Sequence, residues 1–326
     1  MSPDAAPEPV TTLPFTPVIA RPLPHTVTPF RNETVESYTQ RLAAANQTKP
    51  RLLHTPSRWI QCPLNELELL EVLSGQPRTT LAWALPELRH HAPDIAPPPK
   101  ATFRKAPRFG VTTRFACRRC VWRSGGTRPV VVHVRSHFEN VCTKHGLWIG
   151  GGVATAREQL DLRRVPEIVQ AQITLNRLIR RHGEPFMTEC YPHCDRVWRS
   201  LDMRGLVRSD AEALLDRLCE RDPPDPRYRL GAADRRRQAS RYPQVTRFTA
   251  MIASRALRSR ARESHERAER EVPDEFARHF PLDYRPRSIT GPWMRDTLAS
   301  LAKRMDDYAR LLTLSETGEL PMPHST

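Results

Sequence analysis

Apolar side chains recur at helical spacing soon after the start of the chain. Between residues 31 and 46, four of them lie three or four positions apart and so share one face of a predicted helix: Val35, Tyr38, Leu42 and Ala45. Asn32 or Thr34 can cap the start of this helix, and Asn46 can end it. Residues 1–20 show no such period and are rich in proline, which predicts a flexible tail.

A second apolar pattern, in residues 65–88, predicts two short helices joined by a turn at residues 74–77. Seven side chains are candidates for their shared core: Leu67, Leu70, Val72, Leu73, Leu81, Trp83 and Leu85. The arrangement is helix-turn-helix-like, although an αα-hairpin that only packs has the same pattern. Arg78, Thr79 and Thr80 open the second helix, where they can face phosphates or a partner protein.

The pattern then changes to strands and back to helices. Residues 101–150 are rich in β-branched side chains and in turn residues such as Gly125, Gly126 and Pro129, which predicts short strands. Periodic leucine, isoleucine and valine predict helices in 155–181 and 196–221. A long amphipathic helix is expected over 244–270, with a basic second half, and a last helix over 293–312.

These elements predict a mainly α-helical protein with a small β element. The proline-rich segment 222–228 interrupts the helical pattern and marks a predicted domain boundary. The expected organisation is a tail (1–20), a first domain (21–155), a helical region (156–226) and a basic helical C-terminal region (227–326).

The distribution of charge adds a candidate partner. The formal net charge is +15, but only five of the 51 basic residues are lysine, and a GC-rich genome gives such an arginine bias without selection for binding. The excess is nevertheless clustered. Residues 101–150 carry ten basic and one acidic side chain, and residues 227–270 carry thirteen and four, whereas residues 1–100 are balanced. Two basic segments indicate a polyanionic partner, of which DNA is the first candidate.

Several classes of protein are disfavoured. No apolar run approaches a membrane span and the first residues do not resemble a secretory signal, so a cytoplasmic location is expected. The sequence contains no glycine-rich phosphate loop, no HExxH helix and no nucleophile elbow. We therefore expect a protein that is not an enzyme. In the cytoplasm, seven cysteines favour metal binding or free thiols over disulfides.

Residues 117–146 carry two competing sets of metal ligands. Cys117, Cys120, His133 and His137 have the spacing of a DNA-reading zinc finger, whereas Cys117, Cys120, Cys142 and His145 form two tight knuckles. A finger needs its histidines on a helix, but the valines beside His133 favour a strand. The knuckle set is therefore favoured. It predicts a zinc-ribbon-like element with a closed, structural Zn²⁺ site.

A second, weaker cluster contains Cys190, His193 and Cys194. It has no fourth ligand nearby in the sequence, although Cys219 or His182 can approach it in a folded chain. Buried cysteines are common as small apolar side chains, which is the simpler interpretation.

Segments of residues 20–155 resemble the TniQ family in order and spacing. They are RPLPHTVTPFRNETVESYTQRLAAAN, the hairpin that ends LSGQPRTTLAWALPEL, then FACRRC, and then VCTKHGLWI. TniQ and the similar TnsD proteins select targets for Tn7-like and related transposons. The resemblance implies a helix-turn-helix-like part, a zinc-knuckle part with ligands at Cys117, Cys120, Cys142 and His145, and a role between target DNA and the transposition machinery.

Two functional hypotheses follow. In the first, the chain is a DNA-binding adaptor that recruits a transposase or its AAA-type ATPase regulator, with copies of itself as a further candidate partner. In the second, it is an interaction scaffold or transcription-type regulator that zinc merely stabilises. The candidate DNA contacts are Arg114, Arg118, Arg119, Arg123 and Arg128 around the cysteines, and Arg255, Arg258 and Arg262 in the predicted long helix.

Overall fold

The structure is a computed structural model in which the chain forms two compact units. It describes residues 21–50, 53, 64–96, 111–135, 139–203, 211–221, 229–263, 271, 274–276, 278–280 and 292–317. The predicted tail (1–20) and the predicted boundary segment (222–228) lie outside these residues. Unit 1 comprises residues 1–109 and 130–133, and unit 2 comprises 110–129 and 134–326.

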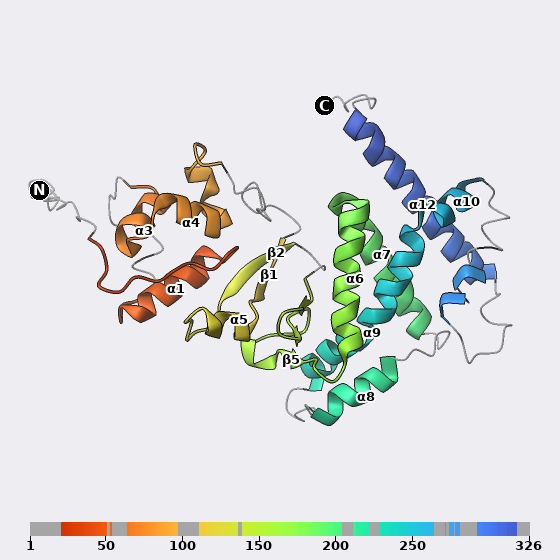
Figure 1. The fold of residues 1–326 in the computed structure, drawn as a ribbon, viewed down its shortest axis with the longest axis horizontal. Helices are drawn as coiled ribbons and strands as arrows, with labels where there is room; N and C mark the ends of the chain where they lie inside the picture. Colours follow the sequence, from red (N-terminus) through yellow and green to blue (C-terminus); the bar gives the residue numbers. More distant parts are fainter. Residues whose placement is uncertain are drawn as a thin grey trace, which may run out of the picture. The chain divides into compact units, whose positions relative to one another are not determined.

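The helices of unit 1 confirm the predicted pattern (Figure 1). Helix α1 (Val35–Ala45) begins after Thr34, whose hydroxyl accepts a hydrogen bond from the Ser37 backbone N–H, and it ends at Asn46. Helices α3 (Glu66–Ser74) and α4 (Arg78–Ala84) form the predicted hairpin, followed by the 3₁₀ helix η1 (Pro86–His91). Gly75 ends α3 with a φ of 65°, a left-handed conformation that favours glycine.

The core of unit 1 joins α1 to the hairpin. The predicted core side chains Leu67, Leu70, Leu81 and Leu85 are fully buried with Tyr38 and Leu42. Val72 and Leu73 are only half-buried. Trp83 departs from the prediction, because it is 45% exposed and its indole N–H donates to the Ala96 carbonyl.

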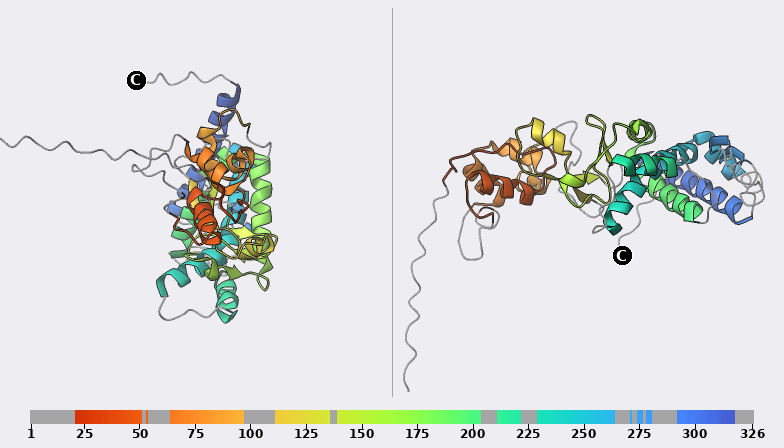
Figure 2. Two further views of the ribbon diagram at one scale, coloured as in Figure 1. Left: turned by 90° about the vertical axis from the view of Figure 1, so that its left-hand side faces the viewer. Right: turned by 90° about the horizontal axis from the view of Figure 1, so that it is seen from below.

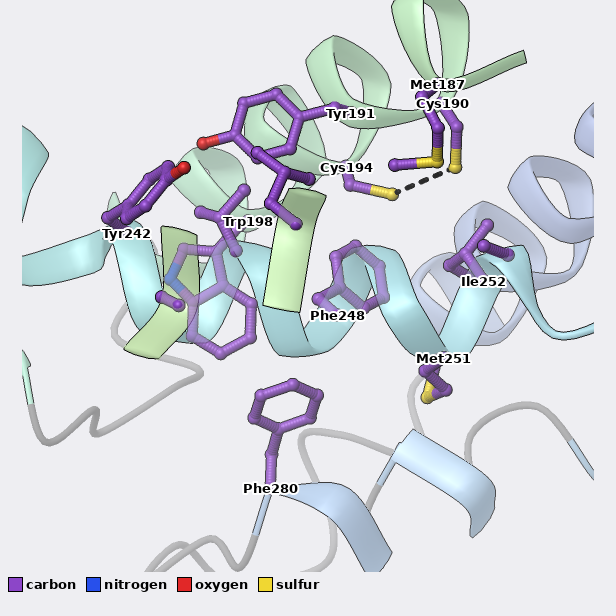
Figure 3. Packing of buried hydrophobic residues seen from close by; sticks show 14 of the residues in the cluster. Met187, Cys190, Tyr191, Cys194, Trp198, Tyr242, Phe248, Met251, Ile252 and Phe280 are labelled. Atoms are coloured by element: carbon purple, nitrogen blue, oxygen red, sulfur yellow. Dashed lines mark hydrogen bonds between the residues drawn. The ribbon is translucent and has the colours of Figure 1, made fainter. Parts of the chain in front are cut away.

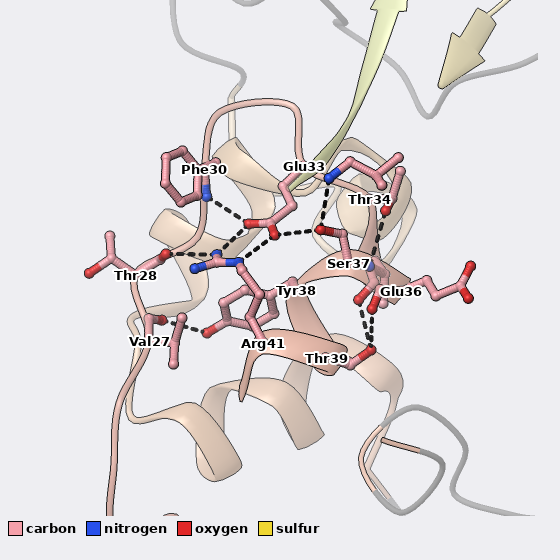
Figure 4. Close-up of polar contacts among 12 residues, drawn as sticks. Val27, Thr28, Phe30, Glu33, Thr34, Glu36, Ser37, Tyr38, Thr39 and Arg41 are labelled. Atoms are coloured by element: carbon pink, nitrogen blue, oxygen red, sulfur yellow. Dashed lines mark hydrogen bonds and ion pairs between the residues drawn. The ribbon is translucent and has the colours of Figure 1, made fainter. Parts of the chain in front are cut away.

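A buried ion pair organises the start of α1 (Figure 4). The Arg41 guanidinium donates Nε to Glu33 Oε1 (2.8 Å) and Nη2 to Glu33 Oε2 (2.6 Å), and both side chains are buried. The Ser37 hydroxyl donates to Glu33 Oε1 and accepts from the Val131 backbone N–H. The carboxylate is thus fully surrounded by donors, which offsets the cost of burying it.

Short strands follow along the chain, as predicted, and the second of them begins in unit 1 and ends in unit 2. β1 (Val111–Phe115) and β2 (Val131–Arg135) form a two-stranded sheet, and helix α5 (Arg118–Arg123) lies between them in the sequence. β3 (Val141–Cys142), β4 (Leu147–Trp148) and β5 (Leu160–Asp161) form a three-stranded antiparallel sheet in which Cys142 pairs with Leu147, and Leu147 with Asp161. The 3₁₀ helix η2 (Ala156–Glu158) precedes β5.

The rest of unit 2 is helical: α6 (Pro166–His182), α7 (Glu184–Met203), α8 (Ala211–Arg221), α9 (Arg229–Ala253), α10 (Arg255–Glu263) and α12 (Pro292–Thr317). Figures 1 and 2 show α6, α7 and α9 side by side. The single long helix predicted over 244–270 is instead divided at Ser254, between α9 and α10. No helix within the described segments has both the length and the apolar character needed to cross a bilayer.

One hydrophobic core runs through unit 2 from Val141 to Met305. At its centre, Trp198 of α7 packs on the rings of Phe248 and Phe280 (Figure 3), with 4.9 Å between the ring centroids of Trp198 and Phe280. The core crosses the predicted boundary near residue 226. The two regions predicted there as separate are therefore one packed body, because the apolar faces of α6, α7 and α8 are covered by α9.

Candidate metal centre

The second knuckle is a tight hairpin turn between β3 and β4. The backbone N–H groups of His145 and Gly146 both donate to the Cys142 carbonyl, at 3.1 and 2.8 Å. Gly146 has a φ of 57°, a conformation that a β-carbon disfavours. The turn therefore folds the Cys142 and His145 side chains toward the same point.

The first knuckle differs from the predicted turn, because a short helix forms there. Cys117 is the residue before α5, and its carbonyl accepts the first helical hydrogen bond, from the Val121 N–H at 3.0 Å. Cys120 lies in the first turn of α5. A helical turn brings residues three apart onto one face, so both sulfurs face the hairpin.

The four side chains converge as the knuckle set predicts. Their ligand atoms all lie within 4.8 Å of one another. His145 Nδ1 is 3.5, 3.2 and 3.6 Å from the sulfurs of Cys117, Cys120 and Cys142, and the sulfurs of Cys120 and Cys142 are 3.7 Å apart. A tetrahedral Zn²⁺ with ordinary Zn–S and Zn–N bonds requires separations of about 3.8 Å between sulfurs and about 3.5 Å between sulfur and nitrogen. The group can hold a metal ion, and its size fits zinc.

The electrostatics of the three thiols also favour a cation. A hydrogen bond shared with Cys142, and then burial, raises the pKa of Cys117, while the same hydrogen bond lowers the pKa of Cys142. Burial, and then the charge of Cys117, raises the pKa of Cys120. Three thiolates this close repel one another, and a divalent cation removes that repulsion.

Gln159 and Arg119 fix the two knuckles in place through their side-chain contacts. Gln159 is buried; its Oε1 accepts from the Arg118 N–H (2.9 Å) and its Nε2 donates to the Ala116 carbonyl (2.8 Å), on either side of Cys117. Arg119 donates to the His145 carbonyl (2.9 Å) and pairs with Asp161 of β5 (3.0 Å). Arg119 thus joins the two knuckles. A lone glutamine beyond the cysteines carries no sequence signal for such a role.

The alternative finger set is not assembled. His133 lies on β2, where its Nε2 is 2.6 Å from Glu87 Oε1 and its side chain is buried. The metal-ligand group in the described part of the chain does not include this histidine. His137 lies outside the described residues. The β-branched segment around His133 forms a strand, as its composition predicted.

The weaker cysteine cluster is part of the hydrophobic core. Cys190 and Cys194, one turn apart on α7, are fully buried with their sulfurs 4.0 Å apart beside Met187 (Figure 3). The His193 ring instead contacts the Glu189 carbonyl, at 2.8 Å. Among the described residues, neither Cys219 nor His182 joins this pair in a metal-ligand group. Burial raises the pKa of Cys194 well above its usual value, as expected for an inert core thiol.

The structure divides the candidate DNA contacts near the cysteines into two groups. Arg118, Arg123 and Arg128 are exposed, and α5 also carries Trp122, which is 77% exposed. Arg114 is half-buried and donates to Asn140 Oδ1 (2.7 Å), and Arg119 makes the internal contacts given above. Only the exposed group is available to a partner as the structure stands.

The predicted arginine stripe of the long helix needs correction. Arg255 is exposed, but Arg258 is only 7% exposed and its guanidinium lies over the Phe186 ring, 4.7 Å from the centroid. The side chain of Arg262 lies outside the described residues. The break at Ser254 starts a new helix, α10, and the contact of α10 with α12 buries the face that carries Arg258.

Comparison of the chain with known protein families, curated proteins and solved structures finds no match.

Proposed function

We propose that this protein is a zinc-stabilised DNA-binding adaptor of the TniQ type, without catalytic activity of its own. The metal is a structural Zn²⁺ held by Cys117, Cys120, Cys142 and His145. Four protein ligands fill a tetrahedral ion, so no coordination position is left for a substrate. The ion fixes α5 against the β3–β4 hairpin.

One observation carries the DNA-binding part of the proposal: of the candidate arginines around the cysteines, those that remain exposed sit on or beside the element that the metal site fixes. Arg118 and Arg123 belong to α5, and Arg128 and Lys144 are exposed nearby in the sequence. A rigid, positively charged surface displaces counterions from the DNA backbone, which makes affinity depend on salt. Contacts of this kind position a protein on DNA without reading its sequence.

The salt dependence of duplex binding tests this proposal. The double variant Arg123→Gln/Arg128→Gln removes two exposed cations and should reduce the log–log salt slope by about 2, equally for unrelated sequences. The matched control is Arg180→Gln/Arg181→Gln, which removes two exposed arginines from the far end of α6 and should leave the slope unchanged. Equal slopes for both double variants and the wild type would reject the surface.

The TniQ-type role rests on the segments quoted from the sequence, and it places the chain between target DNA and a transposase or AAA-type ATPase. Co-purification of the full chain with the ATPase and transposase encoded beside it, if such genes are present, tests this part separately. If the chain binds DNA but neither the ATPase nor the transposase co-purifies with it, the DNA-binding surface is supported and the transposition role is rejected.

Trp122 favours a second candidate function, that of a protein-interaction scaffold. Tryptophan and arginine are the side chains that most often dominate the binding energy of protein interfaces, and here a 77% exposed indole lies between arginines on α5. Under this hypothesis Trp122→Ala abolishes partner capture and leaves the salt slope of DNA binding as it is. Under the DNA hypothesis it weakens DNA binding instead.

A further inference from the structure

A cavity of about 260 Å³ lies in unit 2 where the sheets meet helices α7 and α9. Three arginines from three different elements line it: Arg114 from β1, Arg199 from α7 and Arg241 from α9. Tyr191 and Tyr242 form part of its wall and are almost fully buried. Residues distant in the sequence therefore place three arginines around one hollow. The function proposed above does not use it.

The positive charge of this cavity is only partly balanced. Arg199 pairs with Asp195, and Arg241 lies 3.9 Å from Asp202. Arg114 makes no ion pair with the described carboxylates; its Nη1 donates to Asn140 Oδ1 (2.7 Å) and to the Glu139 carbonyl (3.4 Å). Arg241 Nε is buried and has no hydrogen-bond partner within the described part of the chain. Asp195 lines the cavity too, so its lining holds three arginines and one carboxylate, with Glu139 and Asp202 close outside it.

Burial makes this arrangement costly without an anion. Burial lowers the pKa of Arg114, yet a guanidinium remains charged near neutral pH. Burial also raises the pKa of Tyr242, so the phenol stays neutral and contributes no compensating charge. An oxyanion would supply the missing partner, and the planar fork of an arginine matches the oxygens of a phosphate.

The wall of the cavity is closely fitted. Gly151 lines it, and a β-carbon there would collide with the side chain of Gln238, an amide that also lines the cavity. The Trp148 indole N–H donates to the Gly151 carbonyl at 3.1 Å and holds the loop in place. The volume is near the lower end for ligand pockets, which begin at roughly 300 Å³, so it suits a small ligand rather than a large cofactor.

We propose that this cavity binds a phosphate group through Arg114, Arg199 and Arg241, with Gln238 as a further donor. The group belongs either to a small phosphate ester or to the phosphorylated end of a nucleic acid strand. Both present the same oxyanion to the arginines. The site shares no residue with the exposed arginines of α5. A failure of duplex binding would therefore not contradict phosphate binding in the cavity, and the reverse also holds.

Calorimetric titration of the full zinc-loaded chain with inorganic phosphate, at constant ionic strength kept with chloride, tests the site. Saturable binding is expected. Arg114→Gln and Arg241→Gln should each weaken it at least about tenfold, since each removes a charge-assisted hydrogen bond. Arg180→Gln, which removes an exposed arginine at the C-terminal end of α6 and outside the cavity, should not change it. Circular dichroism checks that each cavity variant is folded. If one variant is unfolded, phosphate binding by the other variant provides the test.

Short 5′-phosphorylated and 5′-hydroxyl oligonucleotides then identify the source of the phosphate. A roughly tenfold preference for the phosphorylated strand, lost in Arg114→Gln, supports the site and assigns it to strand ends. Equal binding of the two strands, together with Arg114-dependent phosphate binding, supports the site and assigns it to a small ester. An absence of saturable phosphate binding in the wild type, or phosphate binding unchanged in both cavity variants, would overturn the proposal.

Discussion

At the scale of single residues, the same side-chain type takes opposite roles in different surroundings. Cys142 faces two other sulfurs and a histidine nitrogen, whereas Cys194 faces an aromatic core. Arg123 is exposed, whereas Arg41 is buried against Glu33. The role of each residue follows from its neighbours in space. Spacing along the chain predicts those neighbours only where they are close in the sequence, as within each of the two knuckles.

The metal ligands give the first prediction. Purified protein should contain about one zinc per chain, and Cys142→Ser should release it, because a structural ion needs its full set of ligands. Cys219→Ser, which alters a half-buried cysteine outside the group, is the matched control and should retain zinc. Metal content by mass spectrometry gives the measurement. His133→Ala should also retain zinc; its loss there would restore the finger assignment.

Glu33 gives the second prediction. Glu33→Gln leaves Arg41 buried without its counter-charge and should lower the free energy of unfolding by roughly 3–5 kcal/mol. Glu167→Gln is the control, because Glu167 pairs with Arg217 at the surface, and such a pair contributes roughly 0–1 kcal/mol. Denaturant unfolding of both variants provides the comparison. Similar losses in the two would show that the buried pair contributes no more than a surface pair.

At the scale of helices and strands, the features predicted correctly are those with local causes. The caps of α1 and the Gly75 end of α3 follow from short-range hydrogen bonds, so the sequence pattern was enough to predict them. The division at Ser254 and the exposure of Trp83 follow from tertiary packing. Helical periodicity continues through both positions and carries no information about which neighbours will cover them.

A pair of glycines tests packing at this scale. Gly152 and Gly125 have nearly equal φ angles, 77° and 76°, but a β-carbon at Gly152 would lie 2.7 Å from the Arg235 backbone nitrogen in α9, whereas Gly125 has open space. Gly125→Ala should therefore cost roughly 1–2 kcal/mol for the left-handed conformation alone. Gly152→Ala should cost roughly 1–3 kcal/mol more. Equal thermal shifts would show that the loop does not pack closely on α9.

At the scale of the whole molecule, the net charge of +15 overstates what a partner meets. Arg41, Arg235, Arg236 and Arg258 are buried, and several contact carboxylates, carbonyls or rings. Composition counts these side chains as surface charge. In the basic segment 227–270, three of the seven arginines whose side chains the structure describes are buried in unit 2, so this part of the segment supplies fewer exposed cations than its sequence indicates.

The two separate hydrophobic cores give a prediction at this scale. Removing zinc with a chelator should lower the hydrogen-exchange protection of α6 and α9, because Val141, Trp148 and Leu160 share their core. Helix α1, whose core is distinct, should lose much less protection. Exchange followed by mass spectrometry reads both regions in one experiment. Equal loss in α1 would show that the two cores unfold together.

The continuity of the second core also bears on how such a protein can be rearranged by recombination. The three-stranded sheet that carries Cys142, and whose β3–β4 turn carries His145, contributes Trp148 and Leu160 to the packing of α6 through α9. A segment exchanged between genes at residues 111–165 would keep all four ligands but leave those apolar faces without a complement. Recombination that preserves a folded metal module must therefore transfer the helices together with it. A crossover in the loops between α6 and α9 would separate the exposed arginines of α5 from the helices that pack against the metal module.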